Sequence, residues 1–311
     1  MSKILITGGA GYLGSVLVPM LLGQGHEVTV LDAFIYRQSS LLSLCANQNF
    51  HIVNGDVRDE QVVRSCIGDA EFIIPLAALV GFPLCERKKE DAIGTNLNAV
   101  RLLLKLRRPE QKVIFPCTNS GYGIGKTEEI YREDSPLNPI SLYGRTKVEA
   151  EKCVLESGNA LSFRFATLFG ASPRMRTDLL VNDFVYRALN DRSVVVFQGN
   201  YVRNYLHVSD AARAFCFAID HFENMKNTQY NCGLSAANLT KLELCAKIKE
   251  HIPAFCYVES SAGEDPDKRN YHVSNEKIEK AGFRPKVSLD EGIEELIKAY
   301  QIIKKQEYGN Y

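Results

Sequence analysis

The chain has 311 residues, of which 45% are hydrophobic and 24% charged, so it can bury a full core in one large domain or two smaller ones. Its 37 basic and 37 acidic side chains cancel, which argues against nucleic acid or an anionic membrane as the main partner. No apolar run reaches membrane-spanning length and no signal peptide precedes the first strand pattern, so we expect a cytoplasmic protein. The nine cysteines are scattered, without the spacing of metal ligands, which predicts reduced thiols and no metal.

The chain opens with an apolar strand pattern that runs directly into a glycine-rich turn. Glycines in such a turn allow tight torsions and a close approach of the backbone to a pyrophosphate. The following helix, at about residues 12–22, would aim its positive end at that phosphate. A turn without a ligand is the alternative, but the pattern favours a bound dinucleotide. Its contacts would come from Gly8, Gly11, Tyr12, Leu13 and Gly14.

Two acidic residues at the next strand ends add to this prediction. Asp32 follows the strand pattern at 28–31, about 20 residues after the turn, where a carboxylate binds ribose hydroxyls and repels a 2′-phosphate. This favours NAD over NADP as the cofactor. Asp56, with Val57 beside it, ends another strand pattern and could reach an adenine amine. The alternative role for Asp56 is to cap the helix that follows.

Strand patterns at 72–76, 113–116 and 161–165 then alternate with helical patterns at 92–106 and 142–155. This alternation predicts an α/β fold of the Rossmann type, in which a doubly wound parallel sheet carries helices on both faces. Ligands of such sheets lie at the carboxyl ends of the strands.

Beyond about residue 170, strand and helix patterns no longer alternate regularly. We expect a helix at 178–190, a strand pair near 194–197 and 202–207, a helix at 208–220 and a C-terminal helix capped at Ser288. These elements predict a smaller α/β lobe beside the sheet. We therefore expect a dinucleotide-binding domain at 1–170 and a substrate-binding lobe at 171–311, with approximate and interleaved boundaries.

The candidate catalytic residues lie at the end of the fifth strand pattern and in the helical pattern that follows it. That strand ends in Thr118, and a later helical pattern carries Tyr143 and Lys147, whose spacing places both on one helix face. A tyrosine with an ordinary pKa of about 10 is a poor base, but a nearby ammonium and an oxidised nicotinamide would favour its phenolate. Tyr143 could then accept a hydroxyl proton as hydride leaves for NAD, with Thr118 bound to the same oxygen. Such a pair alone is usually a packing feature, but together with the glycine turn it indicates hydride transfer.

Nearly the whole chain resembles the extended short-chain dehydrogenase/reductases that modify nucleotide sugars, which include UDP-galactose 4-epimerase-like and dehydratase-like enzymes. The turn at 7–14 matches the family's cofactor turn, and Thr118, Tyr143 and Lys147 match its catalytic residues. The resemblance implies further cofactor contacts from Leu76, Ala77, Ala78 and Asn96. It also implies pairing of helices 92–106 and 142–155 across a homodimer or a higher homo-oligomer.

The resemblance extends to the substrate side. Residues 163–170 look like the family's segment that leads into the sugar site, and residues 203–210 look like the segment whose arginine binds the substrate diphosphate. Residues 173–184 and 263–269 look most like bacterial surface-polysaccharide members, including enzymes that oxidise C4 of a GDP-linked heptose. The implied substrate contacts are Thr118, Asn119, Thr167, Arg174, Asn182, Arg203 and Arg269.

Departures from the family pattern reduce the number of reactions that we expect of this chain. Family 4,6-dehydratases follow the catalytic threonine with an Asp-Glu pair, but here Asn119 and Ser120 stand in those places, and Thr167 replaces the usual asparagine. The resemblance therefore implies oxidation at C4 of a GDP-, UDP- or otherwise linked nucleotide-diphosphate sugar in polysaccharide biosynthesis, by a 4-dehydrogenase or a 4-epimerase. The alternatives are an NAD(P)H-dependent 4-keto-sugar reductase and a non-catalytic NAD-sensing protein.

Five residues also have an ordinary structural interpretation. His207 would order the end of its strand, and Cys117 would be a small buried packing residue. Arg174 and Arg176 would either bind a diphosphate or sugar, or lie in solvent, and Arg269 would either bind in the same way or form a surface ion pair.

Overall fold

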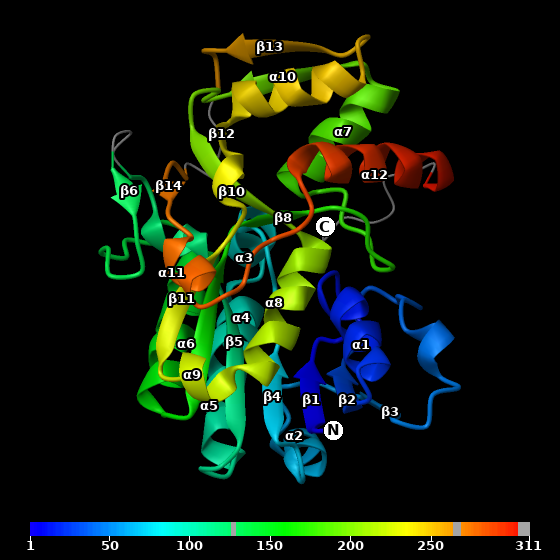
Figure 1. Cartoon of the computed structure of the whole chain (residues 1–311), viewed down its shortest axis with the longest axis vertical. Helices are drawn as coiled ribbons and strands as arrows, with labels where there is room; N and C mark the ends of the chain where they lie inside the picture. Colours follow the sequence, from blue (N-terminus) through cyan, green and yellow to red (C-terminus); the bar gives the residue numbers. More distant parts are fainter. Residues whose placement is uncertain (126–128, 264–268, 304–311) are drawn as a thin grey trace.

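The computed structural model describes residues 1–125, 129–263 and 269–303. Its centre is a sheet of seven parallel strands in the order β11-β7-β5-β4-β1-β2-β3, which confirms the predicted doubly wound fold (Figure 1). The strands of this sheet are β1 (Lys3–Thr7), β2 (Glu27–Asp32), β3 (Phe50–Asn54), β4 (Phe72–Pro75), β5 (Lys112–Thr118), β7 (Ala160–Phe165) and β11 (Thr228–Cys232).

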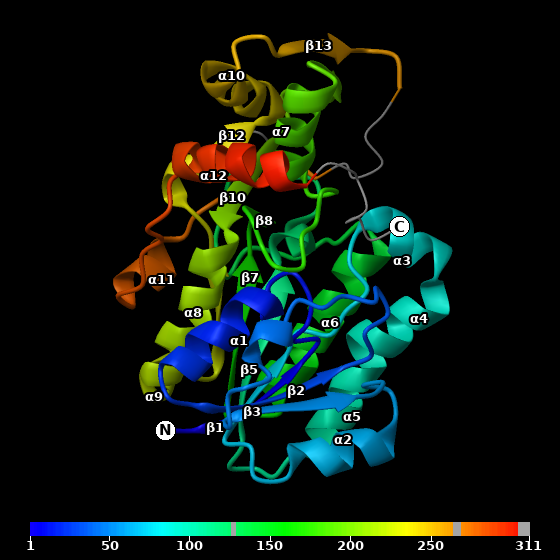
Figure 2. The ribbon, with the colours of Figure 1, turned by 90° about the vertical axis from the view of Figure 1, so that its right-hand side faces the viewer.

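Helices cover both faces of this sheet, because parallel strands need crossovers that return over a face (Figure 2). Alternate residues of β1 show the two layers. Ile4 and Ile6 are buried with the helices of one face, whereas Leu5 is buried with those of the other. The first layer contains α1 (Gly14–Gly23) and α8 (Val208–Asp220), and the second contains α2 (Glu60–Ile67), α5 (Ala99–Leu106) and α6 (Leu142–Glu156).

The strand order reverses between β1 and β4, since β2 and β3 continue from one side of β1 and β4, β5 and β7 from the other. The turn after β1 and the loop after β4 therefore face each other at the carboxyl edge of the sheet. Ligands of open α/β sheets bind at this kind of switch point.

The predicted helix at 92–106 is interrupted. It consists of α4 (Lys89–Ile93), a π-helical turn η2 (Gly94–Asn98) and α5, and it follows the short helix α3 (Phe82–Arg87). Inside η2, the amide of Asn96 bonds the backbone of Leu79 from both of its atoms, at 2.8 Å and 2.9 Å. Single π turns of this kind frequently occur at functional sites.

The smaller lobe lies above the carboxyl edge of the large sheet in Figure 1. The predicted strands near 194–197 and 202–207 are present, but the prediction that they pair with each other is wrong. β9 (Ser193–Phe197) pairs with β13 (Cys256–Ser260), and β10 (Val202–His207) pairs with β8 (Thr167–Phe169) and β12 (Asn238–Thr240). Local alternation identifies a strand but not its partner. The lobe helices are α7 (Leu180–Asn190), α10 (Lys241–His251) and α12 (Leu289–Ile302).

The chain returns from the smaller lobe to the large sheet, so the two regions are interleaved in sequence. α8 packs against α1, and β11 extends the large sheet beside β7, although both follow residue 170. The short helices α9 (Phe222–Met225) and α11 (Glu276–Lys280) also pack on the large sheet, and β6 (Ile130–Tyr131) pairs with β14 (His272–Val273).

The predicted C-terminal helix begins directly after its cap, Ser288. The Ser288 hydroxyl accepts from the Glu291 N–H at 3.2 Å, and the Glu291 carboxylate accepts from the Ser288 N–H at 2.8 Å. No helix within the described ranges is both long enough and apolar enough to cross a membrane.

A buried ion pair joins α6 to the sheet. Arg164 of β7 lies 2.8 Å from the carboxylate of Glu151, and their side chains are only 6% and 3% exposed. The Ser162 hydroxyl donates to the same carboxylate at 2.6 Å. Removal of one partner would leave a buried charge uncompensated.

We therefore expect Arg164→Leu to lower the free energy of unfolding by about 3–5 kcal/mol in urea titrations. The matched control is Arg64→Leu, since Arg64 and Glu60 form a 2.6 Å pair in which both side chains are more than 40% exposed. An exposed pair contributes at most about 1 kcal/mol. Equal losses in the two variants would contradict the prediction.

Candidate active site

The three residues that the sequence predicts as catalytic lie on two elements that pack together, β5 and α6. Thr118 is the last residue of that strand, and α6, which packs against it, carries Tyr143 and Lys147 on consecutive turns. The helix begins at Ser141, whose hydroxyl accepts from the Gly144 N–H at 3.0 Å. This cap sets where the first turn starts and therefore where Tyr143 lies.

Burial dominates the titration of both helix residues. It raises the pKa of the Tyr143 phenol well above its ordinary value, and the guanidinium groups of Arg176 and Arg269 offset this in part. Burial also lowers the pKa of Lys147 to about 8. The Lys147 ammonium lies 4.1 Å from the ring centroid of Phe115, a contact that suits a buried cation. That Lys147 lowers the pKa of Tyr143 stays a prediction.

Thr118 is held by a residue that the sequence interpretation did not select. Its hydroxyl accepts from the Ser120 N–H at 3.1 Å and donates to the Ser120 hydroxyl at 3.0 Å. Ser120 in turn accepts a 2.6 Å hydrogen bond from Arg269. Arg269, predicted as a substrate contact, is therefore connected to Thr118 through Ser120. Its neighbours 264–268, part of the segment compared above with polysaccharide enzymes, lie outside the described residues.

The glycine turn after β1 is packed too closely for side chains. Gly8 has a φ of +71°, and a Cβ there would lie 2.6 Å from the Ala77 backbone. The Asp32 carboxylate accepts from the N–H groups of Ala10 at 3.0 Å and Phe34 at 2.8 Å. Burial raises the pKa of Asp32, and these two N–H groups act against the rise. Asp32 thus reaches the turn that it was predicted to serve.

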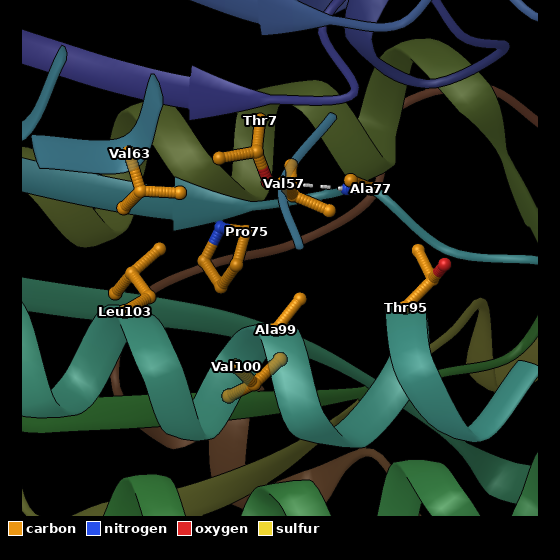
Figure 3. A pocket seen from close by; sticks show the side chains of 9 residues that line it. All are labelled: Thr7, Val57, Val63, Pro75, Ala77, Thr95, Ala99, Val100 and Leu103. Atoms are coloured by element: carbon orange, nitrogen blue, oxygen red, sulfur yellow. Dashed lines mark hydrogen bonds between the residues drawn. The ribbon is translucent and has the colours of Figure 1, made fainter. Parts of the chain in front are cut away.

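A small hollow lies beneath this turn, between β4 and the helix that carries η2 and α5 (Figure 3). The Ala77 N–H donates to the Thr7 hydroxyl across it at 3.4 Å. Val57 and Ala77, both predicted cofactor contacts, belong to its lining. The remaining lining residues are Thr7, Val63, Pro75, Thr95, Ala99, Val100 and Leu103.

Two predicted cofactor contacts are occupied by protein groups. Asp56 pairs with Arg58 at 2.6 Å, and the alternative role of a helix cap is wrong for Asp56, because Asp59 caps α2. Asn96 binds Leu79 in the loop beyond Ala77 and Ala78, so it orders that loop. Both residues therefore position neighbouring segments in this structure.

The substrate-side arginines are not solvated. Arg203 is 2% exposed, with its guanidinium 5.8 Å from the Tyr271 ring centroid. Arg174 is 5% exposed, and its guanidinium lies 4.4 Å from the ring of Tyr36. Arg176 forms a largely buried ion pair with Asp178. The alternative in which Arg174 and Arg176 lie in solvent is wrong, because aromatic and acidic groups cover them.

Asn182, predicted as a substrate contact, is fully engaged within the protein. Its amide accepts from the Gly170 N–H at 3.0 Å and donates to the Arg176 carbonyl at 2.8 Å and to the Tyr12 hydroxyl at 3.4 Å. The Tyr12 hydroxyl donates to the Gly170 carbonyl at 2.7 Å. Asn182 and Tyr12 therefore join the cofactor turn to the segment that carries the arginines.

His207 and Cys117 have the structural roles expected of them. His207 caps α8 through Ser209 and lies 3.2 Å from the Glu295 carboxylate. Cys117 is buried, and burial raises the pKa of its thiol, which keeps the thiol protonated.

Residues 4–233 match the NAD dependent epimerase/dehydratase family. The chain belongs to this family. It is 30% identical over 315 residues to the low-salt glycan biosynthesis protein Agl12 of Haloferax volcanii, which covers 96% of this chain and 98% of the relative. The Thermus thermophilus UDP-glucose 4-epimerase in complex with NAD has a TM-score of 0.82 at 25% identity, over 96% of this chain and 99% of that one. The Thermotoga maritima UDP-glucose 4-epimerase with UDP-glucose has a TM-score of 0.83 at 25% identity, over 97% of this chain and 100% of that one.

The predicted extended short-chain dehydrogenase/reductase fold, the NAD cofactor and enzymatic activity are thereby confirmed. The alternative of a non-catalytic NAD-sensing protein is set aside, since the family consists of enzymes. The site fits the cofactor of this epimerase/dehydratase family: Gly8 lets the turn after β1 meet the loop after β4 at the switch point of the sheet, and Asp32 stands at the edge of that turn.

Three buried polar side chains of this family member have no partner in the described structure. They are the amide of Asn119 and the hydroxyls of Thr167 and Tyr205. Thr167 and Tyr205 are paired residues on β8 and β10, and Thr167 follows the end of β7, where Phe165 pairs with Thr118. Buried polar groups almost always find partners, so these groups require a bound ligand or an ordered water.

We predict that Thr167→Val and Tyr205→Phe leave the free energy of unfolding within about 0.5 kcal/mol of the original or raise it, because each removes a buried unsatisfied hydroxyl. Tyr122→Phe is the contrast, since the Tyr122 hydroxyl donates to Asn231 at 2.7 Å. Its loss should cost about 1–2 kcal/mol. Urea denaturation of the cofactor-free protein measures all three, and a comparable loss in Tyr205→Phe would count against a ligand role.

The low pKa of Lys147 predicts how stability depends on pH. The pKa is about 8 in the folded protein and 10.5 in an ordinary lysine, so between these values the unfolded chain binds more protons. This group therefore makes the free energy of unfolding rise with pH in that window. The free energy of unfolding of the original protein minus that of Lys147→Met should rise by roughly 2 kcal/mol from about pH 7.5 to 9.5, because other titrations cancel in this difference. A constant difference would refute the lowered pKa.

Proposed function

We propose that this enzyme oxidises the C4 hydroxyl of a nucleotide-diphosphate sugar, as a 4-dehydrogenase or a 4-epimerase, in the synthesis of surface polysaccharide sugars. The observation that carries the proposal is that Thr118 ends β5 and that α6, which packs against β5, carries Tyr143 and Lys147 on consecutive turns. The glycan-biosynthesis relative and the UDP-glucose 4-epimerases support the substrate class.

In this reaction the sugar hydroxyl gives its proton to Tyr143 while Thr118 binds the same oxygen. Bound NAD supplies the hydride acceptor and, in its oxidised form, a positive charge near the phenol. In the cofactor-free structure burial keeps Tyr143 protonated, so positive charge is needed to favour its phenolate. The guanidinium groups of Arg176 and Arg269 act in that direction, and we expect the Lys147 ammonium to add to them.

The residues after Thr118 argue against dehydration. A 4,6-dehydratase expels water with an acid pair at these positions, whereas Asn119 carries an amide and Ser120 a hydroxyl. Neither group exchanges a proton readily near neutral pH. The proposal therefore stops at the C4 ketone, which is either released or reduced again. We favour release, because Thr167 replaces the family asparagine and would hold the sugar differently.

A panel of UDP-, GDP- and dTDP-linked sugars, incubated with the protein and NAD in heavy-oxygen water, tests the function. A dehydrogenase should form one reduced cofactor per turnover and a ketone that exchanges its oxygen with solvent. An epimerase should invert C4 without net cofactor reduction and without heavy oxygen. Absorbance of the reduced cofactor and mass spectrometry of the sugar separate these outcomes, and no conversion of any sugar would contradict C4 oxidation.

Replacement of the base gives a second test. Tyr143→Phe should lose ~10²-fold or more in turnover, the usual contribution of a general base, while its affinity for NAD stays unchanged. Tyr186→Phe is the control, because Tyr186 of α7 packs against Tyr300 of α12 in the smaller lobe, with ring centroids 5.2 Å apart. Near-normal turnover of Tyr143→Phe would remove Tyr143 from this role.

A further inference from the structure

The two-stranded sheet of the smaller lobe has an apolar outer face. β9 and β13 run parallel, and their residues Val194, Val196 and Tyr257 pack into the lobe. The opposite face carries Val195 and Val258, which are register partners and are 56% and 65% exposed. Single exposed apolar residues are common on any protein surface, whereas two such residues side by side on an outer sheet form a patch.

The rest of this outer face is uncharged. Ser193 and Cys256, the register partners that begin the two strands, are both exposed. The one charged residue of β13 is Glu259, and its carboxylate accepts from the Gly199 N–H at 2.9 Å. Contact with an identical face would therefore bring no like charges together on this side of the sheet.

β13 is also an edge strand without the usual protection. Within residues 1–125, 129–263 and 269–303, β9 and β13 pair only with each other, so each has one open edge. Figures 1 and 2 both place β13 at the outermost end of the smaller lobe, opposite the end at which α2 and α5 lie. Natural edge strands often carry lysine or proline that blocks pairing with another chain, and β13 contains neither.

The backbone of β13 determines which residues can pair across the open edge. The Cys256 N–H donates at 2.9 Å to the carbonyl of Arg192, which directly precedes β9. Backbone groups of successive residues in a strand point to alternate sides, so Val258 also directs its N–H and C=O to β9. Tyr257 and Glu259 therefore direct theirs to the open edge.

An antiparallel second copy of β13, centred on Val258, matches this pattern. Tyr257 would exchange both backbone hydrogen bonds with Glu259 of the second copy, and all residues of the strand would be paired. Val258 would face its own copy as a non-hydrogen-bonded pair, in which side chains lie closest. Because Val195 lies beside Val258, the valines would form one continuous row across a four-stranded sheet. Glu259 would not face its own copy, so the register avoids repulsion.

We propose that the open edge of β13 binds a second copy of this chain by antiparallel pairing about a two-fold axis at Val258. The contact is isologous, since the same residues serve both copies. It lies at the opposite end of the molecule from α5, so it is separate from the helix pairing that the sequence resemblance implies, and both contacts can form in one assembly. This inference goes beyond the proposed function and does not depend on it.

Analytical ultracentrifugation over a range of protein concentrations tests the contact. The original protein should form a species of about twice the mass of Val258→Lys, because two lysines directly opposite each other repel. Val258→Glu should behave like Val258→Lys, and an equimolar mixture of the two variants should recover the heavier species, since lysine then faces glutamate. Leu42→Lys is the control, because Leu42 is 72% exposed on η1 (Leu42–Leu44), between β2 and β3. It should keep the original mass.

Cysteine cross-linking tests the register. The exposed cysteines of the described chain are Cys45 and Cys256, so both are first replaced by serine. In that background Val258→Cys should form a disulfide-linked dimer under mild oxidation, because the two Cα atoms of such a pair lie about 4.5 Å apart, within reach of a disulfide. Val195→Cys is the matched control and should not link to its copy, since three strand spacings, about 14 Å, would separate the two.

Each outcome decides on the contact. Equal masses of the original protein and Val258→Lys overturn the second copy as the occupant of this edge. Loss of the heavier species in both Val195→Lys and Val258→Lys, without cross-linking of Val258→Cys, would mean that two outer faces stack and would overturn the edge pairing. If Val258→Lys does not fold by thermal melting, the cross-linking comparison decides. Sugar oxidation by Val258→Lys should equal that of the original protein, so a failure of the proposed reaction leaves these tests unaffected.

Discussion

The close approach of the turn after β1 to the loop after β4 is the constraint on which the rest of the site depends. A Cβ at Gly8 would lie 2.6 Å from the Ala77 backbone, so only a glycine allows the two segments to meet. Asp32 holds the turn from the side of β2, and Asn96 holds the loop from the π turn in front of α5. Backbone groups at the switch point are thereby fixed before any cofactor binds.

Buried charge organises α6, the helix that carries Tyr143 and Lys147. Lys147 and Glu151 lie one turn apart on α6; Lys147 rests on the Phe115 ring, and Glu151 pairs with Arg164 of the sheet. A charge in a low-dielectric interior is tolerated only with such partners. The same contacts anchor α6 to β5 and β7, and Tyr143 is positioned by a helix that cannot shift without breaking them.

Several residues act on the site through other residues. Asn182 and Asn96 match expected ligand contacts in the sequence, but their amides bind backbone groups of Gly170, Arg176 and Leu79. Ser120, which occupies the place of an acid in family dehydratases and was not selected as a site residue, contacts Thr118 directly. The type of a residue shows which hydrogen bonds it can make, whereas its neighbours in the folded chain decide which of them it makes.

The sequence by itself determined the parallel sheet, the glycine turn, the capped C-terminal helix and the spacing of Tyr143 and Lys147. These features are local, because strand alternation, helix periodicity and glycine positions depend on residues only a few places apart. Only the tertiary structure decided that β9 pairs with β13, that α8 and β11 return to the large sheet, and that Arg269 reaches Ser120 across 149 residues of chain. A local pattern states which face of a segment is buried, but the distant segment that covers this face is chosen by packing of the whole chain.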